Sequence, residues 1–214
     1  AGPGGSQLSK RLGSLSLREL RNDGFEVASL VGLLTGLGAS DKIEPATLNE
    51  VLGKFDLSHY GRSTPKFDPA ELASLNEKVI HDMSFETAKP KLEALGLGDA
   101  PEEFWNAVRG NCWRVAEAVE WWDVITKQVI PQIDDADAEF LRQAADMLPE
   151  GDLDTTSWKA WTGAIKNATG RKGKELFMPL RKALTGREHG PEMSAMLVLI
   201  GREKACERLC GKAV

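Results

Sequence analysis

Hydrophobic residues recur with the period of an α-helix along most of this chain. Leu30, Leu33, Leu34 and Leu37 follow an i, i+3, i+4, i+7 pattern, which places them on one face of a helix. The alternation of apolar and polar residues that marks a half-buried strand is nearly absent, and residues 14–17 are the best short strand candidate. We therefore predict an all-α, mainly helical fold.

Local signals at the ends of these apolar patterns indicate where helices begin and end. Asp68 directly before Pro69 is typical of an N-cap followed by a first helical turn, and Gly38 is typical of a helix stop. Helices or helical blocks are predicted over residues 47–55, 69–81, 101–125, 134–147, 155–168, 176–184 and 191–210.

The best candidate for a domain boundary is residues 96–99, where the sequence Gly-Leu-Gly-Asp collects turn-forming residues. We predict one helical region over residues 8–97 and a second over residues 98–214. Residues 1–7, with the sequence AGPGGSQ, are typical of a cloning scar or linker and are left out of the fold prediction.

Charge is distributed unevenly along the sequence. The net charge of −5, taken alone, argues against a nucleic-acid partner. Residues 99–154, however, carry fourteen acids against four bases, whereas residues 159–187 carry eight bases against one acid. A polyanion would be attracted to the second segment and repelled by the first. On charge alone, a solvated helix face is the favoured interpretation of both segments.

Six tryptophans are the most distinctive aromatic feature of the sequence. Their flat rings could stack against unpaired RNA bases, or they could pack in a core. Trp158 and Trp161 are i, i+3 neighbours, and Trp105, Trp113 and either Trp121 or Trp122 recur near helical periods. This spacing favours core packing for most of them.

No pattern of side chains builds a complete active site. The histidines at 59, 81 and 189 are too scattered for a metal centre, and no Ser/His/Asp constellation is visible. Three sparse cysteines suit a reducing cytosol, and no apolar run approaches the roughly 20 residues that span a bilayer. Because a signal-peptide pattern is also missing, we expect a cytoplasmic protein without a metal site or membrane contact.

Three separated segments together resemble the bacterial-type glutamyl-tRNA synthetases, which are class I aminoacyl-tRNA synthetases. Residues 8–11, LSKR, resemble their lysine-rich ATP loop, whose general form is KMSKS. The segment KFDLSHYGRSTPKFDPAELASLNEKVI, from Lys54, resembles the stretch that follows this loop. The segment GRKGKELFMPLRKALTGREHGPEMSAMLVLIGREKACERL, from Gly170, resembles the C-terminal signature of the family.

The resemblance implies a C-terminal part of such an enzyme that begins inside the ATP loop, with the catalytic fold upstream. Ser9, Lys10 and Arg11 would belong to the ATP-binding loop, and Lys10 would stabilise charge that develops on the phosphates. Gln7 stands where the family has a lysine, so it is not assigned to the loop. ATP with Mg²⁺ would serve the whole enzyme, and we expect neither a bound cofactor nor catalysis in this chain alone.

The resemblance also implies a stem-contact helical region followed by an anticodon-binding helical cage. In this family the arginine of the Pro-Leu-Arg element reads the anticodon, and it falls on Arg181, with Pro179 expected at the start of a helix near Leu180. The apolar residue that packs near anticodon bases falls on Met193, and Arg109 is the best match to an arginine that monitors the third base. Nearby bases are expected to attract phosphates: Arg171, Lys172 and Lys174.

The partner implied by the resemblance is glutamate tRNA, with glutamine tRNA left open as a second substrate, and neither DNA nor a membrane is expected. The alternative is a non-catalytic helical module that binds another protein through its acidic and basic halves. Binding of RNA at physiological salt distinguishes the two hypotheses, because only the first requires it.

Overall fold

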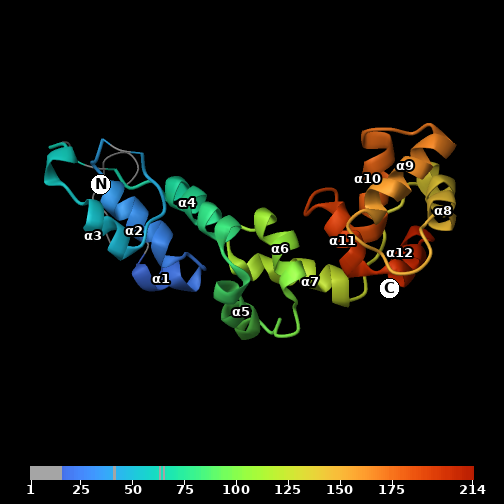
Figure 1. The fold of residues 1–214 in the computed structure, drawn as a ribbon, viewed down its shortest axis with the longest axis horizontal. Helices are drawn as coiled ribbons and strands as arrows, with labels where there is room; N and C mark the ends of the chain where they lie inside the picture. Colours follow the sequence, from blue (N-terminus) through green and yellow to red (C-terminus); the bar gives the residue numbers. More distant parts are fainter. Residues whose placement is uncertain (1–15, 41, 63, 65) are drawn as a thin grey trace. The chain divides into compact units, whose positions relative to one another are not determined.

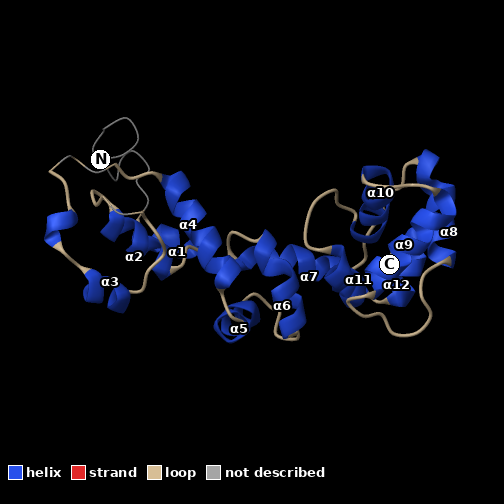
Figure 2. Cartoon of the chain, turned by 45° about the horizontal axis from the view of Figure 1, so that its top comes forward, coloured by secondary structure: helices blue, strands red, loops and turns tan. Residues whose placement is uncertain are grey.

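The computed structural model describes residues 16–214, apart from residues 41, 63 and 65. Its described residues form helices joined by loops, as Figures 1 and 2 show, and the prediction of an all-α fold is confirmed. Extended pairing among the described residues is limited to one isolated antiparallel bridge between Ala39 and Tyr60.

The described residues form two compact units. The first contains the residues up to Lys91 together with Cys112–Glu117, and the second contains Leu92–Asn111 and Ala118–Val214. This division falls inside a helix, α5 (Phe85–Ala94). The domain boundary predicted at residues 96–99 from turn-forming residues stays a prediction.

The helices of the first unit besides α5 are α1 (Leu17–Asn22), α2 (Val27–Gly36), α3 (Leu48–Lys54), α4 (Pro69–Asp82) and the short 3-10 helices η3 (Leu57–His59) and η5 (Val115–Glu117). Helix α2 packs against α4, and a buried apolar cluster joins these two helices and α1; its members are Leu20, Leu33, Leu72 and Leu75. The cluster lies on one face of each helix, as their apolar spacing requires.

The buried side-chain amide of Asn76 connects separate segments of the first unit. The Asn76 side chain is fully buried, and its oxygen accepts hydrogen bonds from the Glu26 amide at 2.7 Å and the Ser29 hydroxyl at 3.0 Å. Its nitrogen donates to the carbonyl oxygens of Trp113 at 2.7 Å and Gly24 at 3.3 Å. Because every polar atom of the amide is bonded, its burial is compatible with a stable core.

Two predicted helix starts are confirmed together with their caps. The Thr47 hydroxyl accepts from the Glu50 amide and the Glu50 carboxylate accepts from the Thr47 amide, which completes a capping box at the start of α3. The Asp68 carboxylate accepts from the Ala70 amide, and Pro69 occupies the first position of α4. Both helices end within one residue of the predicted position.

The prediction of a short strand over residues 14–17 is wrong where the structure describes it. Ser16 is the N-cap of α1, and Leu17 is its first residue. The Ser16 hydroxyl and the Glu19 side chain form a capping box, at 3.1 Å and 2.7 Å. This local hydrogen-bonding pattern favours a helix start more strongly than three or four residues can favour a strand.

The second unit contains α6 (Glu102–Val108), α7 (Ala118–Thr126), α8 (Ala138–Asp146), α9 (Ser157–Thr169), α10 (Lys174–Thr185), α11 (Met193–Ile200) and α12 (Arg202–Leu209), with the 3-10 helices η4 (Arg109–Asn111) and η6 (Asp135–Asp137). The helical block predicted over 101–125 is therefore divided in two. Helix α6 is followed by η4, which contains Gly110, and α7 begins only at Ala118. The block over 191–210 is likewise divided at Gly201, whose φ of +80° ends α11.

Pro179 does not start a helix near Leu180, contrary to the sequence prediction. It lies inside α10, which begins five residues earlier at Lys174. A proline cannot donate to the carbonyl oxygen of the residue four positions before it, which here is Glu175. Arg171 compensates, because its Nη1 donates to that carbonyl at 3.4 Å.

Large aromatic rings fill the core of the second unit. Trp105 and Trp161 are fully buried, and the Trp161 indole nitrogen donates to the carbonyl of Ala144 at 2.9 Å. Trp121 is 8% exposed, whereas the other three tryptophans are only partly buried. The interpretation of the tryptophans as core residues is confirmed for Trp105, Trp121 and Trp161.

Candidate nucleic-acid interface

The candidate site is formed by α10, the loop that follows it and the first residue of α11. Helix α10 ends at Gly186, whose φ of +68° turns the chain sharply. The loop returns to α11, which begins at Met193. Of the predicted residues, Arg181 lies on α10 and is bonded to Pro191 of this loop, and Met193 is the first residue of α11.

Arg181 is held at the base of this loop. Its Nη1 donates to the carbonyl oxygen of Pro191 at 3.0 Å, and the side chain is half-buried. Burial lowers the pKa of the Arg181 guanidinium, against a smaller opposing effect of the Glu192 carboxylate. An arginine still remains charged under these conditions. Within the described part of the chain, no carboxylate lies within ion-pair distance of it, so its other N–H groups are available to a ligand.

Met193, the second predicted residue, is a buried side chain. It is 4% exposed at the start of α11, directly after the loop to which Arg181 is bonded. The Arg181 guanidinium is a charged planar donor that can offer hydrogen bonds to the edge of an unpaired base, whereas Met193 lies almost wholly in the core.

The loop also packs on a tryptophan ring. An added Cβ atom at Gly190, where φ is +145°, would lie 2.1 Å from Cη2 of Trp121, so only glycine allows this approach. The Arg187 guanidinium lies over the same ring, 5.0 Å from its centroid. An open pocket of about 530 Å³ lies beside these groups, and its lining includes Asn111, Gln132 and His189.

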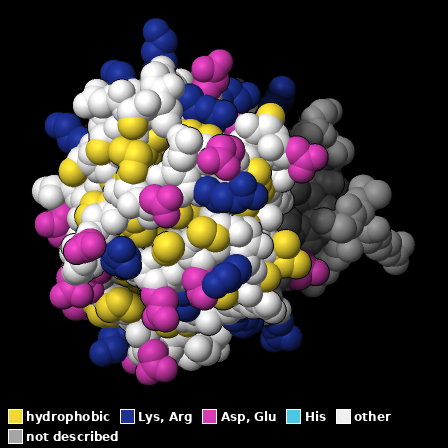
Figure 3. Space-filling model, turned by 90° about the vertical axis from the view of Figure 1, so that its right-hand side faces the viewer, with side chains coloured by type: hydrophobic (Ala, Val, Ile, Leu, Met, Phe, Trp, Pro, Cys, Tyr) yellow, Lys and Arg dark blue, Asp and Glu magenta, His cyan; other side chains and the backbone are white. Residues whose placement is uncertain are grey.

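Acids from the preceding segment pair with several of the predicted bases. Arg187 is bonded to Glu120 at 2.8 Å and Lys182 to Asp134 at 3.0 Å. Arg171 forms an ion pair with Asp137. Figure 3 shows the resulting mixture on the side of the molecule that carries α8–α12, where Lys and Arg side chains lie among Asp and Glu.

The other predicted contacts have different surroundings. The Arg171 guanidinium is committed within the protein, since it also lies 4.1 Å from the ring centroid of Phe140. Lys172 and Lys174 are exposed at the start of α10, where a phosphate can reach them. Arg109 is half-buried in η4, after α6, and α6 packs against α11.

The residues predicted for the ATP loop, Ser9, Lys10 and Arg11, lie outside the described residues. Among residues 16–214 without 41, 63 and 65, no group of three or more His, Cys, Asp and Glu side chains is placed to hold a metal ion. In the same residues, no helix combines the length and apolar character needed to cross a bilayer.

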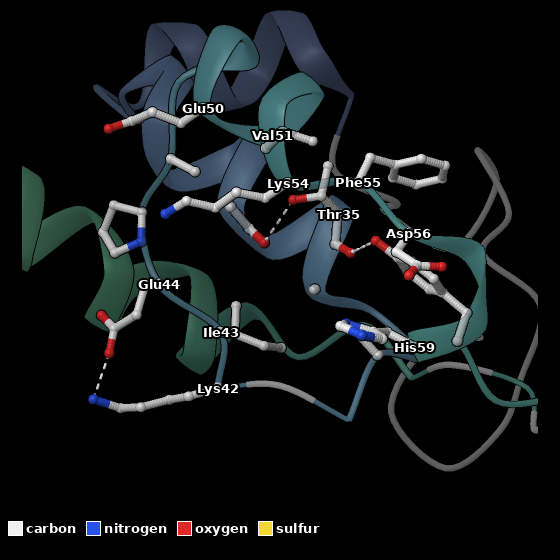
Figure 4. Close-up of a pocket in the computed structure, with 16 residues that line it drawn as sticks. Thr35, Lys42, Ile43, Glu44, Glu50, Val51, Lys54, Phe55, Asp56 and His59 are labelled. Atoms are coloured by element: carbon white, nitrogen blue, oxygen red, sulfur yellow. Dashed lines mark hydrogen bonds and ion pairs between the residues drawn. The ribbon is translucent and has the colours of Figure 1, made fainter.

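The first unit contains a separate pocket of about 250 Å³ between α2, α3 and residues 42–46 (Figure 4). Gly32 of α2 approaches the Glu44 carbonyl so closely that a Cβ atom would lie 2.1 Å from its oxygen. Lys42 and Glu44 form an ion pair at its rim, and the Tyr60 hydroxyl donates to the Thr35 carbonyl at 2.7 Å. These polar groups bind one another, which is typical of packing between elements.

Residues of the site that the sequence did not single out are Trp121, Gly190 and Asp134. The sequence showed the basic run from 159 to 187 and the acidic block before it. It did not show which acid forms an ion pair with which base. The paired residues are 48 positions apart for Lys182 and Asp134 and 67 for Arg187 and Glu120. Such pairs depend on the folded arrangement of α7, α10 and the loop before η6.

Residues 107–211 match the family described as the anticodon binding domain. The chain is 51% identical over 97% of its length to glutamate–tRNA ligase 2 of Hyphomonas neptunium, and 48% identical over 97% to glutamate–tRNA ligase 2 of Methylorubrum populi. It covers 47% and 46% of these two proteins, so it spans about half the length of the curated relatives it matches.

The fold also matches a solved structure. A crystal structure of a glutamate tRNA ligase from Elizabethkingia meningosepticum superposes with a TM-score of 0.79 at 17% identity, over 97% of this chain and 48% of that one. The resemblance that the three sequence segments predicted is therefore confirmed. The chain is similar to glutamate–tRNA ligases along almost its whole length, and its residues 107–211 match the anticodon binding domain family.

Proposed function

We propose that this chain is the tRNA-binding part of a glutamate–tRNA ligase, and that its second unit reads the anticodon. The observation that carries the proposal is the position of Arg181. It is half-buried, bonded to a backbone carbonyl and not to a carboxylate, and lies within the residues that match the anticodon-binding domain.

Arg181 would contact the edge of an anticodon base through its planar N–H groups, a geometry that lysine cannot reproduce. Met193 would lie against an unpaired base, and Arg109 would contact the third one. Lys172 and Lys174 would attract phosphates without regard to sequence, because they are exposed charges at the start of a helix. Arg171 contributes mainly through α10, which it holds together around Pro179.

The whole protein would ligate glutamate to glutamate tRNA with ATP, in the cytoplasm, and the acceptance of glutamine tRNA is a further possibility. Ser9, Lys10 and Arg11 would contact the phosphates of ATP, and Mg²⁺ would accompany the nucleotide. The chain described here would bind tRNA without catalysing the reaction. Neither DNA nor a membrane would be a partner.

Chemical footprinting of glutamate tRNA with the purified chain tests this function. We expect protection of the anticodon nucleotides, with weaker, sequence-independent protection of backbone phosphates near the lysines. Protection confined to the backbone would contradict anticodon reading. Absence of any protection at physiological salt would favour the alternative, a helical module that binds another protein.

A further inference from the structure

Helix α10 carries an exposed aromatic ring one turn before Arg181. Phe177 is 45% exposed, although phenylalanine is among the residues most often found buried. Residues four positions apart on a helix are neighbours on one face, so Phe177 and Arg181 lie next to each other along α10. Lys174, three residues before Phe177, is exposed on the same face. This face therefore presents an aromatic ring with a cation on either side along the helix.

A second aromatic ring, from α9, supports Phe177. The ring centroids of Trp158 and Phe177 are 6.3 Å apart, and the two rings are tilted by 34°. Trp158 is half-buried and meets the buried Trp161 edge to face, with ring centroids 5.6 Å apart. Three rings thus lead from the core to the surface between α9 and α10 (Figure 1), and Phe177 is the outermost.

The polar groups around this ring are not used within the protein. Lys174 forms neither an ion pair nor a hydrogen bond through its side chain in the part of the chain that the structure describes. Within that same part, the indole nitrogen of Trp158 has no hydrogen-bond partner. A phosphate can therefore reach the lysine without first breaking an ion pair.

We propose that Phe177, supported by Trp158, is a stacking site for an unpaired base of the anticodon loop, beside the base whose edge Arg181 contacts. The proposal rests on the proposed function, because it adds a second contact to the same site. An aromatic ring accepts the flat face of any base, whereas an arginine reads the edge of one. Lys174 attracts the phosphate of the stacked nucleotide. Stacking holds the loop in place while Arg181 reads it.

A nucleotide fits this face better than an apolar segment of another protein does. Across the described helices α9, α10 and α11, Phe177 is the only large apolar side chain that is exposed. A protein partner is expected to cover a contiguous apolar patch, whereas a single ring between two cations complements one base and its phosphates.

The test compares two substitutions of Phe177 in the full chain. Phe177→Leu removes the ring and keeps an apolar side chain, whereas Phe177→Tyr keeps the ring. Leu95→Ala is the control for the loss of an exposed apolar side chain in the same unit, because Leu95 is 40% exposed. Fluorescence anisotropy with glutamate tRNA and with the same tRNA carrying a substituted anticodon, over a range of salt, gives each affinity and its salt dependence.

We expect Phe177→Leu to weaken the binding of both tRNAs by about five- to tenfold, because stacking tolerates any base. The slope of log affinity against log salt should stay unchanged, because loss of a stacked base releases no counterions. Phe177→Tyr and Leu95→Ala should bind as the unchanged chain does. Lys174→Gln should instead reduce the slope by about one phosphate contact.

Photo-crosslinking locates the stacked base. 5-Iodouridine is placed at one unpaired position of the anticodon loop at a time, and the crosslinked peptide is identified by mass spectrometry. We expect one position to crosslink to Phe177 or Trp158, with a lower yield in Phe177→Leu.

Equal affinities of Phe177→Leu and Phe177→Tyr would overturn the proposal, whether both match the unchanged chain or both fall below it, since the ring would then not matter. Crosslinks that reach neither Phe177 nor Trp158 from any loop position would do the same. If instead the unchanged chain bound both tRNAs with equal affinity, anticodon reading would be wrong while the difference between the two Phe177 variants remained. The two failures are thereby distinguished.

Discussion

At the residue scale, a single buried arginine connects three parts of the second unit. Arg208 of α12 is fully buried, and it donates to the carbonyl oxygens of Leu184 at 2.8 Å, Val124 at 2.9 Å and Val214 at 3.1 Å. Burial lowers the pKa of its guanidinium. The side chain thus connects the end of α10, α7 and the last residue of the chain.

Replacing Arg208 by alanine should lower the free energy of unfolding by more than about 3 kcal/mol, because it removes the donor from the Leu184 and Val124 carbonyls and opens a cavity. Arg202→Ala is the matched control on the same helix. Arg202 is exposed and donates to the Pro149 carbonyl, so its loss should cost no more than about 1 kcal/mol. Urea unfolding measures both, and equal losses would contradict the role assigned to Arg208.

Gly190 is required by the approach of its loop to the Trp121 ring. Gly190→Ala should displace the loop, lower the free energy of unfolding by about 1–3 kcal/mol and change the tryptophan fluorescence. Gly163 of α9 has open space where its Cβ would lie, so Gly163→Ala should be neutral or stabilise by up to about 1 kcal/mol. A Gly190→Ala variant as stable as the unchanged chain would show that the loop does not need glycine.

At the scale of elements, the start of α9 depends on one carboxylate. A single oxygen of Asp154 accepts from the amides and hydroxyls of Thr156 and Ser157, at 2.7–2.9 Å. These bonds lower the pKa of the Asp154 carboxyl below its ordinary value of 3.8. A lowered folded-state pKa means stabilisation that is present above about pH 3.8 and is lost as the pH falls through the folded-state value.

Asp154→Asn should therefore lower the thermal midpoint at pH 7 and leave a smaller difference from the unchanged chain at pH 3. Asp152→Asn, two residues earlier and exposed, is the control for the loss of one charge. Melting curves followed by circular dichroism at both pH values give the comparison. A difference that is constant with pH would mean that the Asp154 bonds do not depend on its ionised form.

Elements with strong local signals could be predicted from the sequence, and elements without them could not. The caps at Thr47 and Asp68 locate α3 and α4 because the hydrogen bonds lie within four residues. Helix α5 was missed, since it has few apolar residues and Pro90 lies inside it. The apolar pattern predicted the start of α10 within two residues, but the start near Leu180 expected from Pro179 is wrong, because Arg171, outside the helix, satisfies the carbonyl that the proline leaves unbonded.

At the scale of the whole molecule, the family resemblance predicted individual site residues, whereas charge predicted only a segment. Arg181 and Met193 were assigned from motifs; the structure bonds Arg181 to Pro191 and buries Met193 at the start of α11, and their roles stay predictions. Charge alone indicated a basic segment, but its partners in the acidic segment are set by folding across dozens of residues. The ion pairs are a property of the folded unit, and no local pattern encodes them.

The most direct test of anticodon reading by Arg181 measures the affinity of the unchanged chain and of Arg181→Ala for two tRNAs. Glutamate tRNA and the same tRNA with a substituted anticodon are titrated against the unchanged chain and Arg181→Ala by fluorescence anisotropy. We predict that Arg181→Ala weakens binding of glutamate tRNA by about 1–3 kcal/mol and reduces the difference between the two tRNAs, with Arg181→Lys restoring little of it. An Arg181→Ala variant that keeps both the affinity and the anticodon preference of the unchanged chain would contradict the account.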